Sequence, residues 1–246
     1  MPEPASVMRP HVLAIGSCTS RKRDDGCPHP LSLDDFRDAR RLREREAALA
    51  AWRRPAGQMY VGRQHTHAVA GIETLRRRFG HGFAELAIVS AGYGLLREDA
   101  PIVPYDVTFA TMSRGEARAW ARHLGVAAAA REACASHPLV VFLLGSRYLE
   151  ATEPPLAAGG AQRFVFLARP AETTRLAGPG VTIVPAGAGE AAAYREGLVA
   201  LKGKMFRLFA LGLARSDGAL LEGVLRDDTP ASFIQAMRLG LEVSPQ

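Results

Sequence analysis

Three apolar segments, each ending in small residues, constrain the fold of this chain most strongly. They are residues 11–18 (HVLAIGSC), 84–91 (AELAIVSA) and 138–146 (PLVVFLLGS). Short apolar runs bounded by turn-forming residues are typical of strands buried on both faces of a parallel sheet. Shorter segments of the same character, at 163–168 and 181–186, indicate further strands.

Segments with helical spacing alternate with these strands. We expect helices over residues 32–52, 66–79, 113–130 and 190–213, and a short helix from near Thr229. Ser113 and Glu116 have the spacing of a capping box, which fixes the expected start of the third helix. Strands that alternate with helices predict an α/β fold, with a mainly parallel central sheet flanked by helices and a helical C-terminal region.

The domain organisation follows from the same pattern. A chain of 246 residues can bury one large core. We expect a flexible N-terminus over residues 1–10, an α/β core domain over 11–189, and a helical extension over 190–246 that packs on the core.

Composition excludes several classes of protein. No stretch is long and apolar enough to span a bilayer, and the N-terminus lacks the apolar region of a secretory signal, so we expect no membrane partner. The cysteines, Cys18, Cys27 and Cys134, are odd in number and lack C-x-x-C spacing. This argues against a disulfide framework and a structural zinc site. We expect a cytoplasmic protein with no metal and no cofactor.

The net charge of +6 favours a polyanionic partner, because lysine and arginine bind phosphates. An excess of arginine over lysine, together with many alanines and glycines, also fits a GC-rich genome. The charge alone leaves both explanations open.

The loop after the first strand, GSCTSRK at 16–22, can bind an anion. Backbone amides and hydroxyls after a strand can surround a phosphate, and two cations add charge. The candidate residues are Ser17, Cys18, Ser20, Arg21 and Lys22. The spacing matches neither a P-loop nor G-x-G-x-x-G, which argues against a P-loop kinase and a nicotinamide enzyme. The alternatives are a solvated turn and, for Cys18, a small buried residue in place of a nucleophile.

The loop after the second strand carries Ser90, Gly92, Tyr93, Tyr105 and Asp106. Aromatic faces stack on nucleobases, and a carboxylate can bond a base edge or orient water. We expect the two tyrosines and Asp106 to be the catalytic group. The alternative is that the tyrosines cap the core and Asp106 caps a turn.

The loop after the third strand has the same composition, with Ser146, Arg147 and Tyr148. Arg147 can hold a phosphate through two parallel hydrogen bonds. Equally, Ser146 can cap a helix while Tyr148 packs. His65 is a further candidate as an acid or base, whereas His65 and His67 are too closely spaced to share a helix face and bind zinc.

A late basic helix is the last candidate. Lys202, Lys204 and Arg207 stand between apolar residues and suit contact with a nucleic-acid backbone, although a basic helix is also a common solvated face. The three strand-end loops meet at one edge of a parallel sheet, where ligands bind in such folds. We therefore expect the loop residues to line one pocket.

The segment SAGYGLLREDAPIVPYDV at 90–107 resembles the signature of bacterial peroxide stress proteins of the YaaA type. It is also similar to a set of uncharacterised bacterial domains that carry S-A-x-Y-G-L and I-x-P-Y-D. IGSCTSRKR at 15–23 resembles an early segment of that second group, and LLGSRYLEA and LKGKMFRLFA are similar to later YaaA segments. Asp106 stands where YaaA proteins tend to carry a basic residue, so the chain is closer to the uncharacterised set.

The resemblance implies an α/β core that binds DNA and, in more distant relatives, acts on bases of tRNA or DNA. Together with the residues above, it predicts a protein that binds nucleic acid or a nucleotide and cleaves or exchanges an N-glycosidic bond. DNA is expected as the polymer in preference to RNA. A non-catalytic DNA-binding stress protein and an enzyme of free nucleotides are the alternatives.

Overall fold

The computed structural model describes residues 11–24, 26–154, 156 and 158–242. The segment predicted to be a flexible N-terminus, residues 1–10, lies outside the described residues. None of the described helices has the length and apolar character needed to cross a membrane.

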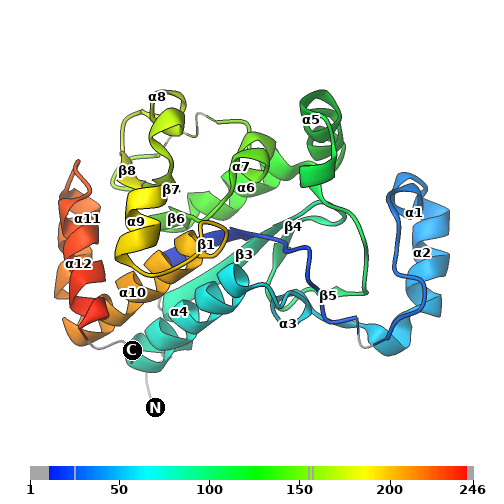
Figure 1. The fold of residues 1–246 in the computed structure, drawn as a ribbon, viewed down its shortest axis with the longest axis horizontal. Helices are drawn as coiled ribbons and strands as arrows, with labels where there is room; N and C mark the ends of the chain where they lie inside the picture. The colour runs from blue at the N-terminus through cyan, green and yellow to red at the C-terminus, as the bar shows by residue number, and fades with distance from the viewer. Residues whose placement is uncertain (1–10, 25, 155, 157, 243–246) are drawn as a thin grey trace, which may run out of the picture.

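A six-stranded sheet with the order β4-β3-β1-β6-β7-β8 forms the centre of the molecule (Figure 1). The strands are β1 (Val12–Ser17), β3 (Ala84–Ser90), β4 (Gly94–Arg97), β6 (Leu139–Phe142), β7 (Arg163–Ala168) and β8 (Val181–Pro185). All neighbouring pairs are parallel except β3 and β4. The α/β fold with a mainly parallel sheet, predicted from the sequence, is confirmed.

The strand order creates a crevice at the carboxyl ends of β1 and β6. β1 comes first in the chain and lies between β3 and β6, so the chain first extends the sheet on one side of β1 and then on the other. In doubly wound sheets, the loops on either side of such a switch point diverge and leave room for a ligand.

Helices cover both faces of the sheet. They are α1 (Leu33–Arg37), α2 (Ala39–Ala48), α3 (Ala56–Met59), α4 (Arg63–Phe79), α5 (Arg114–His123), α6 (Val126–Ala135), α7 (Ser146–Ala151), α8 (Thr173–Leu176), α9 (Ala188–Ala193), α10 (Leu201–Arg215), α11 (Ala219–Arg226) and α12 (Ala231–Leu241). Figure 1 shows α4 and α10 on one side of the sheet and α6 and α7 on the other. Arg54–Pro55 (β2) and Pro101–Ile102 (β5) form a separate two-stranded sheet.

Three predicted helices are each broken into two. The helix expected over 190–213 is interrupted at residues 194–200, between α9 and α10. The helix expected over 32–52 stops at Asp38, whose carboxylate accepts hydrogen bonds from the amides of Arg40 and Arg41 and so begins α2. The helix expected over 113–130 stops at Gly125, which has a φ of 65°. Its start is confirmed, because Ser113 and Glu116 form the predicted capping box.

Several elements escaped the sequence analysis, among them the short elements β2, α3, β5 and α8. Residues 94–97, expected in a loop, fold back as β4, antiparallel to β3. α11 has no counterpart among the predicted helices, although the helical C-terminal region itself is confirmed.

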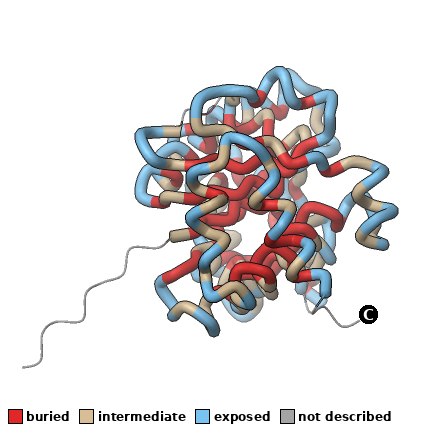
Figure 2. The backbone as a smooth tube through the Cα atoms, turned by 90° about the vertical axis from the view of Figure 1, so that its left-hand side faces the viewer, coloured by how far each residue is buried: buried red, intermediate tan, exposed pale blue. Residues whose placement is uncertain are grey.

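The C-terminal helix α10 is part of the core. It packs between α4 and α12, and most of its residues are buried. Gly203 and Gly212 permit this close packing, because a Cβ at these positions would collide with the carbonyl oxygens of Gln64 and Ala236. Figure 2 shows the buried segments gathered in the interior, with exposed loops around them.

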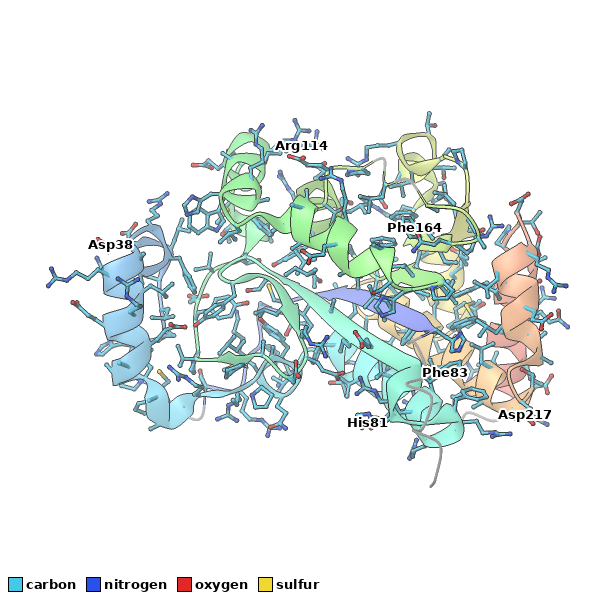
Figure 3. All side chains as sticks on the ribbon, turned by 180° about the vertical axis from the view of Figure 1, so that it is seen from behind. Asp38, His81, Phe83, Arg114, Phe164 and Asp217 are labelled. Carbon is cyan, nitrogen blue, oxygen red and sulfur yellow. The ribbon has the colours of Figure 1, made fainter. Side chains whose placement is uncertain are left out.

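Helix α2 lies at the periphery and has no buried residue. Figure 3 shows Asp38, at its start, at one end of the molecule and Asp217, after α10, at the other.

Candidate functional site

A cavity of about 720 Å³ lies where the carboxyl ends of β1 and β6 meet the start of α4. We call it the switch-point cavity. It is lined by Ser17, Cys18, Thr19, Ser20 and Arg21 after β1, Gly62, Arg63 and Gln64 at α4, Thr108, Ala110, Gly145 and Tyr148, and Glu196, Gly197, Leu198, Val199, Ala200 and Lys202 before and in α10. The volume is within the range of sites for small molecules, about 300–1,000 Å³.

One wall of the switch-point cavity is cationic. Arg21 is exposed there, and Arg63 donates a hydrogen bond of 2.8 Å to Glu196. α4 begins at Arg63, after an N-cap at Gly62, and no side chain of the N-cap bonds its first turn. The amides of this turn and the positive end of the helix dipole therefore lie at the cavity. This wall can bind an anion, which would share Arg63 with Glu196.

Three side chains, from the loop after β1, the segment after β5 and helix α7, form a hydrogen-bonded chain beside the cavity. The Tyr148 hydroxyl lies 3.1 Å from the Cys18 sulfur and 3.0 Å from the Thr108 hydroxyl. Burial raises the pKa of Tyr148, so its hydroxyl stays neutral. The chain fixes the Cys18 side chain, which is itself buried.

The prediction that Lys202 of the late basic helix contacts a nucleic-acid backbone is wrong. Its side chain is buried and donates a hydrogen bond to the Leu144 carbonyl at the end of β6, while also lining the switch-point cavity. Burial lowers its pKa to about 8, against the opposing effect of Glu172. Lys202 is therefore placed for contact with a ligand in the cavity, and a nucleic-acid backbone outside cannot reach it.

Lys204 and Arg207 do not line the switch-point cavity. Both are half-buried on α10, close enough to His67 to lower its pKa, although burial is the larger cause. The sequence pattern does not reveal that α10 is covered on two sides.

Tyr105 does not have the role expected from the sequence. Its ring is 2% exposed, and its hydroxyl is 2.8 Å from both the Ser90 and the Tyr60 hydroxyls. A ring buried in this way cannot stack on a substrate. The alternative drawn from the sequence, that it caps the core, describes Tyr105 correctly, with side chains as its partners.

Tyr93 belongs to the same aromatic cluster. Its ring makes edge contacts with Phe36 and Tyr105, and its hydroxyl donates to Glu46 over 2.9 Å. Ser90 and Gly92 shape this turn, since the Ser90 hydroxyl accepts hydrogen bonds from the amides of Gly92 and Tyr93. None of these residues lines the switch-point cavity.

Asp106 lines a different hollow. Its side chain is exposed in a hollow between α1 and α5, which also includes Thr108. Lys22 lies near it, with the ammonium 4.3 Å from the centre of the Tyr105 ring. Burial lowers the pKa of Lys22, and the nearby Asp106 carboxylate opposes this effect.

The loop after β6 is only partly directed at the cavity. Ser146 accepts a hydrogen bond of 2.6 Å from Arg169 and is the first residue of α7, after an N-cap at Gly145. Arg147 is half-buried, and its Nη1 has no hydrogen-bond partner among the described residues. Neither residue lines the switch-point cavity, so the phosphate-binding role predicted for Arg147 has no support there.

His65 has a structural position. Its Nε2 lies 2.8 Å from the Gly57 carbonyl oxygen, and burial lowers its pKa. The neutral ring joins α4 to α3 and does not face the cavity.

The sequence analysis missed Thr108, Arg63 and Gln64. The expected start of the second helix at residue 66 placed the last two in a loop, whereas α4 begins at Arg63. Gln64 donates to the Leu143 carbonyl and so ties the helix start to β6. Gly62, before Arg63, was the available signal, because glycine is accepted as an N-cap.

Among the described residues, no group of three or more histidine, cysteine, aspartate or glutamate side chains is arranged to hold a metal ion. The fold and cavity define a doubly wound α/β protein with a candidate ligand site at its switch point. Residues 49–177 match DUF6884, a family of unknown function, and the chain belongs to this family. No curated protein matches the chain. The likeness to YaaA-type proteins stays a prediction.

Proposed function

We propose that the protein binds a nucleotide, with a phosphate group in the switch-point cavity. The observation that carries this proposal is the cationic wall, where Arg21, Arg63 and the uncapped start of α4 line one cavity. Amide groups at a helix start and arginine side chains are the donors that bind phosphate best.

Lys202 supports an anionic ligand. Its amine is held at the end of β6, at the cavity, and no carboxylate among the described residues forms a salt bridge with it. A buried amine without a paired anion is costly to charge. Glu172 is close enough to oppose the lowering of the Lys202 pKa, and a bound phosphate in the cavity would add a second negative charge.

The placing of α10 favours a nucleotide over a long polymer. The helix expected to follow a nucleic-acid backbone packs between α4 and α12, and Lys202 is buried on it. Cleavage or exchange of an N-glycosidic bond remains a prediction. In hydrolysis, water oxygen would bond to the sugar C1′ as the base leaves with a proton.

Calorimetric titration with inorganic pyrophosphate and guanosine monophosphate tests the binding. Arg63→Gln should lower the affinity for both ligands about tenfold, because a charge-assisted hydrogen bond to the phosphate is lost. Arg77→Gln is the matched control, because Arg77 is exposed near the other end of the same helix. Equal losses in the two variants, or no binding by wild type at millimolar ligand, would refute the proposal.

A base-release assay tests the chemistry. Chromatography should detect free base from a nucleotide or from modified or plain DNA, at a rate lowered by Asp106→Asn. If neither protein releases base from any of these, the protein binds without cleaving.

A further inference from the structure

A second hollow, of about 710 Å³, lies between α1 and α5. We call it the α1–α5 hollow. It is lined by Leu33 and Arg37 of α1, by Asp106, Val107, Thr108, Thr111 and Met112, and by Glu116, Ala119, Trp120 and His123 of α5. Figure 1 shows α1 and α5 at the same end of the molecule.

The α1–α5 hollow adjoins the switch-point cavity. Thr108 lines both, and its hydroxyl bonds to Tyr148, which also lines the switch-point cavity. A ligand with its phosphate in the switch-point cavity can therefore extend past Thr108 into the α1–α5 hollow.

The wall at α5 offers a fixed aromatic surface. The Trp120 indole N–H donates a hydrogen bond of 2.7 Å to the Ala91 carbonyl, which holds the ring. His123 stacks against it with centroids 4.8 Å apart and planes 20° apart. Leu33 and Met112 add apolar surface to the lining. Such a surface suits a flat heterocycle, since rigid aromatic rings lose little entropy on contact.

Two carboxylates line the hollow, and only that of Asp106 forms no hydrogen bond with a described residue. Glu116 accepts from the Ser113 amide, and Arg37 pairs with Asp34 at 3.0 Å. The Asp106 carboxylate forms no hydrogen bond or salt bridge with a described residue; Lys22 interacts with it electrostatically. Asp106 is thus a charged acceptor beside the apolar and aromatic part of the hollow, formed by Leu33, Met112 and Trp120.

We propose that the α1–α5 hollow is a guanine-binding subsite, in which Asp106 accepts hydrogen bonds from the base edge. A carboxylate has two acceptor oxygens, and guanine presents adjacent N1–H and N2–H donors. Adenine offers one amino group beside an acceptor nitrogen, and uracil one imino group. This inference rests on the proposed function for its orientation, and it assigns Asp106 to base recognition, in place of orienting water.

Tryptophan fluorescence gives a direct test. The chain has two tryptophans, so Trp52→Phe leaves Trp120 as the single reporter. In this background, guanosine should quench emission and bind at least about tenfold more tightly than adenosine or uridine, as expected for two hydrogen bonds to a charged group. Asp106→Asn should remove that preference. Asp24→Asn, an exposed aspartate outside both cavities, is the control.

Guanosine and pyrophosphate, titrated separately, distinguish this inference from the proposed function. Guanosine binding that depends on Asp106 supports the subsite even where pyrophosphate does not bind. Pyrophosphate binding that depends on Arg63, with no base preference and no effect of Asp106→Asn, refutes the subsite and leaves the proposed function intact. Failure of guanosine and pyrophosphate alike refutes both.

Discussion

The hydroxyl of Tyr148 lies 3.1 Å from the Cys18 sulfur, and this contact joins helix α7, which follows β6, to the loop after β1. The same hydroxyl is 3.0 Å from Thr108, which lines both cavities. Sequence positions far apart thus meet at the carboxyl ends of the strands. The following predictions test what this arrangement does.

Tyr148→Phe should destabilise the fold by about 1 kcal/mol, because it removes a buried hydroxyl and leaves the Cys18 thiol without its partner, while Thr108 keeps its bond to the Ala110 amide. Urea denaturation measures the loss. Tyr194→Phe, at a half-buried tyrosine whose hydroxyl makes no hydrogen bond to a described residue, should change stability by less than about 0.5 kcal/mol. Similar losses in the free energy of unfolding for the two variants would show that the hydrogen bonds of Tyr148 do not stabilise the fold.

Tyr105→Phe should cost about 1–3 kcal/mol of stability and leave nucleotide affinity unchanged. The reason is that its hydroxyl joins Ser90 and Tyr60 in the interior and its ring contacts no cavity. A double-mutant cycle with Tyr60→Phe should show coupling, since the two hydroxyls bond to each other. The opposite pattern, intact stability with weakened binding, would restore the stacking role predicted from the sequence.

The pH dependence of stability should show the titration of Lys202. Its pKa in the folded protein is lowered from 10.5 to about 8 by burial. Between these values the unfolded chain holds a proton that the folded protein has lost, so stability rises with pH across this window. The rise in the free energy of unfolding amounts to roughly 3 kcal/mol and is complete above pH 10.5. Below pH 8 the lysine is charged in both states, and the cost of burying that charge no longer changes with pH.

Lys202→Met should lack this rise. Denaturant unfolding of both proteins at several pH values checks it, and the difference between the two curves isolates Lys202 from other titrating groups. Parallel curves would contradict a lowered pKa at this position.

Gly212→Ala should destabilise the protein by about 3 kcal/mol or more, because the added methyl group would collide with the Ala236 carbonyl oxygen between α10 and α12. Gly115→Ala is the matched control within a helix, since nothing lies within 4 Å of its added Cβ. That variant should be neutral or stabilising by up to about 1 kcal/mol. Equal thermal shifts in the two variants would contradict the close packing of α10.

Local patterns explain what could be predicted from the sequence. β1, β3 and β6 are apolar runs whose small terminal residues mark their ends, and a parallel sheet brings those ends to one edge. The capping box of Ser113 and Glu116 is likewise local. The fold class and the location of a cavity follow from such signals.

The misassigned residues depend on contacts distant in sequence. The sequence around Tyr105 predicts an exposed loop residue, because it does not show that Ser90 and Tyr60 bond to its hydroxyl in the folded protein. The sequence around Lys202 predicts a surface cation, because it does not show that α4 and α12 pack against its helix. Charge and helical spacing do not show which face of a helix is buried when small residues such as Gly203 allow packing on several sides.

The most direct test of the central claim is an amide NMR titration of the labelled protein with guanosine monophosphate. Phosphate at the switch point predicts the largest shifts at Ser20, Arg63 and Gln64, where the loop after β1 meets the start of α4. Shifts confined to α11 and α12, or spectra that remain unchanged at millimolar nucleotide, would contradict it.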